Sequence, residues 1–181
     1  MKWILLGFVF LAIVGGILVL IGTPASQEEE PVTVTNFMEC VEAGNPVMTS
    51  YPAQCRHNGE LFVEEIGNVL EKNDLIQLTT PRPNEKIASP LTITGEARGY
   101  WFFEASFPII LTNWDGLIIA EGYATAEGDW MTEKFVPFTA ELTFDADTSV
   151  SNRGSLILKK DNPSGLPEND DALEIPIFFS E

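Results

Sequence analysis

The sequence is poor in the residues that carry most enzyme chemistry. It has one histidine and two cysteines in 181 residues. It contains neither a Gly-x-Ser-x-Gly nucleophile motif nor a glycine-rich phosphate-binding loop. Its many acids offer pairs of carboxylates, but any acidic chain offers such pairs, so they do not identify a glycosidase. We therefore predict no enzyme activity, no catalytic residue and no bound cofactor.

Positive charge is also scarce. Ten lysines and arginines stand against 27 aspartates and glutamates, which gives a formal net charge of −17. A surface this acidic repels phosphate groups. The composition therefore excludes nucleic acid and anionic lipid headgroups as direct partners.

Charged residues are absent from Trp3 to Ile21, a length that suffices for a membrane-spanning helix. Lys2 precedes this stretch and Glu28–Glu30 follow it, so the positive-inside rule places the N-terminus in the cytoplasm. We predict an uncleaved, single-pass anchor over residues 1–22. The alternative is a signal peptide cleaved after Ala25, which would release a secreted protein. Both alternatives place the bulk of the chain outside the cytoplasm.

A polar, acidic linker over residues 23–35 leads to a small module over residues 36–66, which contains Cys40 and Cys55. Outside the cytoplasm a lone pair of cysteines favours a disulfide, and a loop of this length gains about 3 kcal/mol from closure. A zinc site on these cysteines and His57 is an alternative that lacks an evident fourth ligand. A third alternative is that the loop between the two cysteines binds a protease, as in small protease inhibitors.

The module resembles a short cysteine-containing segment that precedes other domains in bacterial surface proteins. Its aromatic residues Phe37, Tyr51 and Phe62 are expected to form a miniature core. Residues 67–74 are predicted to be a connector.

Short runs of alternating apolar and polar residues dominate residues 75–181. Val136, Phe138, Ala140, Leu142 and Phe144 provide the clearest example, since they share one face of a strand. The sequence Asn113–Gly116 predicts a hairpin turn, because Asp-Gly adopts positive φ angles at little cost. Seven strands without an intervening helix predict an all-β, seven-stranded immunoglobulin-like sandwich. The expected strands are 75–79, 90–97, 102–112, 118–126, 135–144, 155–159 and 173–179.

Five motifs extend this interpretation, and they are distributed in order along residues 75–179. They are Ile87-Ala88-Ser89-Pro90-Leu91-Thr92-Ile93-Thr94-Gly95-Glu96-Ala97, Phe103-Glu104-Ala105, Trp114-Asp115-Gly116, Gly154-Ser155-Leu156 and Ile175-Pro176-Ile177. In these motifs the chain resembles the immunoglobulin-like domain of bacterial spore germination. The resemblance implies a cell-envelope interaction module without catalytic residues. It does not by itself imply a part in sporulation.

Alternating strand directions would bring the loops 98–101, 127–134 and 161–171 to one end of the sandwich, together with the connector. Tyr100, Trp101 and Trp130 lie in these loops and form a candidate partner-binding patch. The alternative is that these aromatic side chains cap the core or contact the cysteine module. A weaker hypothesis places calcium in the last loop, on Asp161, Glu168, Asp170 and Asp171, although their spacing fits no calcium-binding motif.

These features predict a membrane-tethered, extracytoplasmic binding or scaffold protein of the bacterial cell envelope. The membrane is contacted through the N-terminal helix, and the expected partner is an envelope protein or a cell-wall polymer. The alternatives are a secreted inhibitor-like protein and a carbohydrate-binding protein. The open edges of a sandwich also offer sites for self-association or for strand addition by a partner.

Overall fold

The computed structural model describes residues 33–180. Residues 34–181 form one compact unit. The membrane anchor that the sequence predicts over residues 1–22 lies outside the described residues. Among the residues that are described, no helix is long and apolar enough to cross a membrane.

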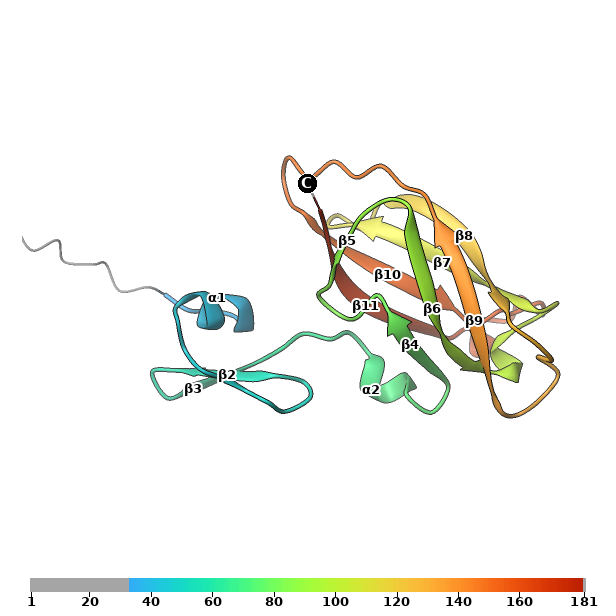
Figure 1. The fold of residues 1–181 in the computed structure, drawn as a ribbon, viewed down its shortest axis with the longest axis horizontal. Helices are drawn as coiled ribbons and strands as arrows, with labels where there is room; N and C mark the ends of the chain where they lie inside the picture. The colour runs from blue at the N-terminus through green and yellow to red at the C-terminus, as the bar shows by residue number, and fades with distance from the viewer. Residues whose placement is uncertain (1–32, 181) are drawn as a thin grey trace, which may run out of the picture. The chain divides into compact units, whose positions relative to one another are not determined.

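The first part of the described chain is the disulfide module, residues 34–66. It contains helix α1 (Phe37–Glu42) and a three-stranded antiparallel sheet in the order β1-β2-β3. Figure 1 labels α1, β2 and β3. The strands of this sheet are β1 (Val47–Met48), β2 (Gln54–His57) and β3 (Glu60–Val63). A connector with the single-turn helix α2 (Val69–Lys72) leads to the next sheet.

The remaining strands form one continuous eight-stranded sheet that folds over on itself. Its order is β4-β6-β9-β8-β7-β10-β11-β5, and only two residue pairs, at Thr125 and Ala126, join β8 to β9. The sheet therefore forms two layers, β4-β6-β9 and β8-β7-β10-β11-β5 (Figure 1). We call this part the sandwich. Its strands are β4 (Ile76–Thr80), β5 (Lys86–Ile87), β6 (Leu91–Arg98), β7 (Ser106–Asn113), β8 (Ile118–Ala126), β9 (Phe135–Leu142), β10 (Arg153–Lys159) and β11 (Ala172–Phe179).

The core of the sandwich lies between the two layers and follows the alternation of the sequence. In β9, Val136, Phe138, Ala140 and Leu142 are buried while the residues between them are exposed. Phe107 from the opposite layer packs edge-on against Phe138, with ring centroids 5.0 Å apart. This alternation confirms the immunoglobulin-like sandwich as an architecture, because each strand presents one apolar face to the other layer.

The predicted number of strands is wrong. The described residues contain eleven strands, eight of them in the sandwich and three in the disulfide module. The additional sandwich strand, β5, has two residues and pairs in parallel with the end of β11. A pairing this short leaves no alternation in the sequence to detect.

The strand predicted to begin at Phe102 starts instead at Ser106. The preceding residues form a 3-10 turn, η1 (Gly99–Trp101), and Glu104 and Ala105 adopt positive φ values of 48° and 63°. The hairpin turn predicted at Asn113–Gly116 is present. The Asn113 side chain accepts hydrogen bonds there from the backbone N–H groups of Asp115 and Leu117.

Gly154 on β10 lies where the backbone of β7 and the side chain of Phe179 leave no room for a methyl group. A Cβ at this position would overlap the Thr112 carbonyl oxygen and lie 2.7 Å from the Phe179 ring. Because a neighbouring backbone cannot easily move, we expect Gly154→Ala to lower the free energy of unfolding by about 1–3 kcal/mol. Urea denaturation measures this change.

Gly122→Ala on β8 is the matched control. Its nearest neighbour would be the flexible end of Leu142, 3.1 Å away, so the loss should stay below about 1 kcal/mol. Equal losses in the two variants would contradict the close approach at Gly154.

Candidate functional site

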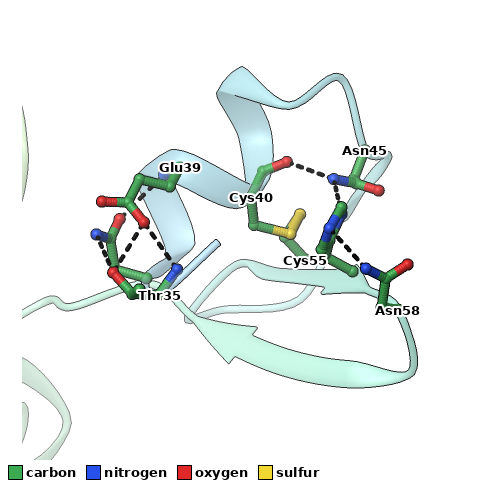
Figure 2. The surroundings of a disulfide bond; sticks show 8 residues. Thr35, Glu39, Cys40, Asn45, Cys55 and Asn58 are labelled. Atoms are coloured by element: carbon green, nitrogen blue, oxygen red, sulfur yellow. Dashed lines mark hydrogen bonds between the residues drawn. A yellow bond between two sulfur atoms is a disulfide. The ribbon is translucent and has the colours of Figure 1, made fainter. Parts of the chain in front are cut away.

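Helix α1 presents one half of the disulfide, and its N-terminus is fixed by side-chain hydrogen bonds. Asn36 caps the helix by accepting a hydrogen bond from the backbone N–H of Glu39 at 3.0 Å. The Glu39 carboxylate in turn accepts hydrogen bonds from the backbone N–H and the hydroxyl of Thr35, at 2.7 and 2.8 Å (Figure 2). These two bonds lower the pKa of Glu39, the backbone bond most. The reciprocal pattern resembles a capping box and sets the direction of a helix too short to be stable alone.

Cys40 on α1 and Cys55 on β2 form the predicted disulfide and are fully buried. Since both sulfur atoms take part in this bond, the alternative of a zinc site on these residues is wrong. The ring nitrogens of His57 lie 3.1 and 3.0 Å from the side-chain amides of Asn45 and Asn58 (Figure 2). Within residues 33–180, no three His, Cys, Asp or Glu side chains gather in a group that could hold a metal ion.

The core of the module consists of the disulfide and Phe62, with Val34, Phe37 and Val41 packed against them. Tyr51, which the sequence assigned to this core, is exposed instead. Partial burial of its hydroxyl raises the pKa of Tyr51, and the nearby Glu64 carboxylate raises it further. Tyr51 lies in the bend before β2 and lines a pocket with Ile66 and with Leu173 and Ile175 of β11.

The connector is bound to the edge of β11 by the side chain of Asn68. Its amide nitrogen donates to the Ala172 carbonyl at 2.9 Å, and its amide oxygen accepts from the Glu174 N–H at 2.8 Å. The Asn68 N–H donates to the Glu174 carbonyl at 3.2 Å. A Cβ at Gly67 would overlap that carbonyl, so a glycine is needed for this approach. These bonds replace part of a missing neighbouring strand.

A second contact holds the end of the module. The Asn84 amide nitrogen donates to the Glu65 carbonyl at 2.8 Å and to the Glu64 carboxylate at 3.1 Å. The Asn84 backbone N–H donates to the Pro176 carbonyl of β11 at 2.8 Å. Asn84 therefore joins the module to the sandwich and adopts a positive φ of 63° to do so.

Between the module and the outer face of β10 and β11 lies a groove with a volume of about 670 Å³. Its sandwich wall carries Trp114, Arg153 and Phe178, and its module wall carries Met38 and Leu61. Trp114 is 50% exposed, and the Arg153 guanidinium lies 5.6 Å from the centre of the Phe178 ring. The volume falls within the range of small-ligand sites. The groove was not predicted, because its walls come from residues far apart in the sequence.

The structure brings the three predicted loops together at one end of the sandwich, which we call the loop end. The Gly99 N–H donates to the Lys134 carbonyl at 3.1 Å, and the Asp161 N–H donates to the Trp101 carbonyl at 3.0 Å. Arg98 reaches the connector, where its Nε donates to the Asp74 carbonyl at 2.9 Å. The connector thus arrives at the loop end, as alternating strand directions predict.

The aromatic residues of the loop end are not equally accessible. Trp101 has 0% exposure and belongs to the sandwich core, and Trp130 is half-buried against that core. Only Tyr100 is exposed, at 50%. For Trp101 the alternative applies, because its side chain belongs to the core between the layers. Partner binding at the loop end stays a prediction, with Tyr100 as its accessible residue.

Two of the four acids predicted to bind calcium have other contacts. Asp171 forms an ion pair with Lys72, and Asp170 accepts a hydrogen bond from the Asn162 amide at 2.8 Å. The loop is stabilised by such bonds around Asn162 and by the 3-10 turn η2 (Pro167–Asn169). Calcium binding at this loop stays a prediction.

Removal of the disulfide should destabilise the module more than the sandwich. The crosslink closes a loop of 15 residues, which corresponds to about 3 kcal/mol. In the double variant Cys40→Ser and Cys55→Ser we expect faster amide hydrogen exchange in α1, β2 and β3. Exchange in β6 and β9 should be unchanged, and an equal acceleration in those strands would contradict a separately stabilised module.

Burial of Trp101 predicts that its role is packing. We expect Trp101→Ala to lower the free energy of unfolding by about 3–5 kcal/mol, because it removes a large core side chain. The adjacent, exposed Tyr100 provides the control, and Tyr100→Ala should change stability by less than about 0.5 kcal/mol. Thermal and urea denaturation measure both changes. A Trp101→Ala protein as stable as the parent chain would refute the packing role.

Comparison with known proteins agrees with this architecture. No curated protein and no solved structure matches the chain. A family model, described as the immunoglobulin-like domain of bacterial spore germination, matches residues 75–165. The matched range begins just before β4 and contains every sandwich strand up to β10, while β11 follows it. Since the match spans half of the sequence, the chain belongs to the family of immunoglobulin-like domains of bacterial spore germination.

Proposed function

We propose that this chain is a non-catalytic binding protein of the bacterial cell envelope, and that the groove recognises a cell-wall glycan. In this proposal residues 1–22 anchor the protein in the membrane and the rest lies outside the cytoplasm. The groove is the single observation that carries the proposal. Family membership and the disulfide support the location, because disulfides persist in oxidising compartments.

The groove combines apolar and polar groups in a way that suits a sugar chain. Trp114 and Phe178 provide aromatic faces, against which the C–H faces of sugar rings can stack. Asn84 and Asn113 also line the groove. The amide oxygen of Asn84 and the amide nitrogen of Asn113 form no hydrogen bond within the described chain, so they can bind hydroxyl and N-acetyl groups. Such a concave, largely apolar surface with a few polar groups is typical of ligand sites.

Arg153 adds a preference for a carboxylate. Its side chain is exposed, and it forms neither an ion pair nor a hydrogen bond with any other residue in the described part of the chain. A guanidinium binds a carboxylate through two parallel hydrogen bonds. In the cell wall such carboxylates are carried by the stem peptides that are attached to the glycan. Arg153 would therefore orient such a chain along the aromatic wall of the groove.

The absence of catalysis is part of the proposal and has chemical support. Both cysteines of the sequence are oxidised, so neither provides a thiolate nucleophile. The single histidine, His57, lies between the side-chain amides of Asn45 and Asn58 and is not among the residues that line the groove. A general base would need a nucleophile or a reacting group within hydrogen-bonding distance.

The test is co-sedimentation of the full chain, purified in mild detergent, with isolated cell-wall sacculi at low and high salt. Because the protein and the wall are both acidic, nonspecific attraction between them is weak, and binding that survives high salt reports specific contacts. We expect Trp114→Ala and Arg153→Gln each to weaken binding by about tenfold, the loss expected for one good contact.

Tyr100→Ala is the matched control, because Tyr100 and Trp114 are equally exposed, at 50%. It should leave binding unchanged. If Tyr100→Ala weakened binding and the groove variants did not, the binding site would lie at the loop end and not in the groove. If the wild-type chain stayed in the supernatant, the cell wall would be excluded as the partner. An envelope protein would then be the expected partner.

A further inference from the structure

Strand β8 is an edge of the larger layer that no described element covers. From Ile118 to Tyr123 it pairs only with β7, and its contact with β9 is limited to Thr125 and Ala126. No other backbone hydrogen bond involves residues 118–123 within the described chain. Half of the backbone N–H and C=O groups along this stretch therefore lack a protein partner.

The direction of these groups follows from the hydrogen bonds at the end of β8. The Ala126 N–H donates to the Ala105 carbonyl, just before β7, at 2.9 Å, whereas the Glu127 N–H donates to Pro137 of β9 at 2.7 Å. Backbone groups alternate in direction along a strand. Gly122 and Ala124 therefore point toward β7, and Glu121 and Tyr123 point toward the open edge.

At the other edge of the same layer, the backbone groups of β11 are covered by other parts of the chain. There β11 is covered by Asn68 and Asn84 and by the two-residue strand β5. Proteins also protect sheet edges with lysine or proline. The sequence Leu117–Ala126 contains neither residue, and its single charge is on Glu121. The edge at β8 thus lacks both kinds of protection.

We propose that β8 binds an extended, basic segment of a partner protein, which adds to the sheet as a further antiparallel or parallel strand. The open N–H and C=O groups of Glu121 and Tyr123 would bond to the backbone of that segment. Their exposed side chains lie on the outer face, and Tyr123 is 66% exposed. On the inner face Leu142 lies against Gly122 and provides an apolar contact.

The negative charge of Glu121 determines which kind of added strand can pair with β8. A residue of the added strand opposite Glu121 shares its face, and opposite charges on such a cross-strand pair stabilise a sheet. A second copy of this chain would bring another β8 with its own Glu121 and a net charge of −17. Like charges would then oppose association. A segment with lysine or arginine at alternate positions meets both requirements.

The test uses amide hydrogen exchange at residue resolution on the full chain in mild detergent. The probe is a short peptide of alternating valine and lysine, and its counterpart of alternating valine and glutamate is the control. We expect the valine–lysine peptide to slow exchange at Glu121 and Tyr123 by about tenfold or more, because new backbone bonds protect those amides. Gly122 and Ala124, already bonded to β7, should keep their rates. The control peptide should protect neither pair.

Two variants separate strand addition from general attraction. Tyr123→Pro removes an N–H from the open edge without removing a bond to β7, so it should abolish the protection. Glu121→Lys keeps the backbone N–H and reverses the side-chain charge. In this variant the valine–glutamate peptide, and not the valine–lysine peptide, should slow exchange at positions 121 and 123. Unchanged exchange at Gly122 and Ala124 shows that β8 is intact in both variants.

Three results would overturn the proposal. The first is no protection at saturating valine–lysine peptide. The second is equal protection by both peptides. The third is protection of Glu121 and Tyr123 in the protein alone, which would show that the edge is already covered. If that protection increased with protein concentration, the occupant would be a second copy of the chain. None of these outcomes depends on the groove or on its proposed glycan.

Discussion

The structure depends on how the backbone groups at the edge of β11 are satisfied. A strand at the end of a sheet leaves N–H and C=O groups without neighbours, and buried groups of this kind are costly. Asn68 provides an N–H, an amide oxygen and an amide nitrogen to this edge, and Asn84 provides a further N–H. The same residues join the connector and the end of the disulfide module to the sandwich. One local requirement of the backbone thereby fixes the module and creates the groove.

The two ends of the larger layer consequently have different roles. The β11 end is covered by the protein's own connector, and the groove lies beside it. The β8 end is left open apart from its pairing with β7. We propose side-chain recognition at the β11 end and backbone recognition at the β8 end of the same layer.

The two cores are stabilised by different means. The sandwich buries a large apolar cluster between its layers, including Trp101, whose indole N–H has no hydrogen-bond partner in the described chain. An unpaired buried donor costs about 1–3 kcal/mol, so the packing of this ring must exceed that cost. The buried cluster of the module consists of the disulfide and Phe62. The module relies on a crosslink because a segment of this size cannot bury enough apolar surface.

The sequence alone determined the properties that depend on neighbouring residues. Alternation predicted the seven longer strands, and Asn113 and Gly116 predicted the hairpin turn. The expected extracytoplasmic location and the lack of an evident fourth ligand favoured the disulfide over zinc. Only the tertiary structure decided the burial of Trp101, the exposure of Tyr51, the short pairing of β5 and the groove. These depend on contacts such as that of Asn68 with Glu174, which are 106 residues apart. Local patterns define which face of a strand is apolar, but they do not encode which distant segment will cover it.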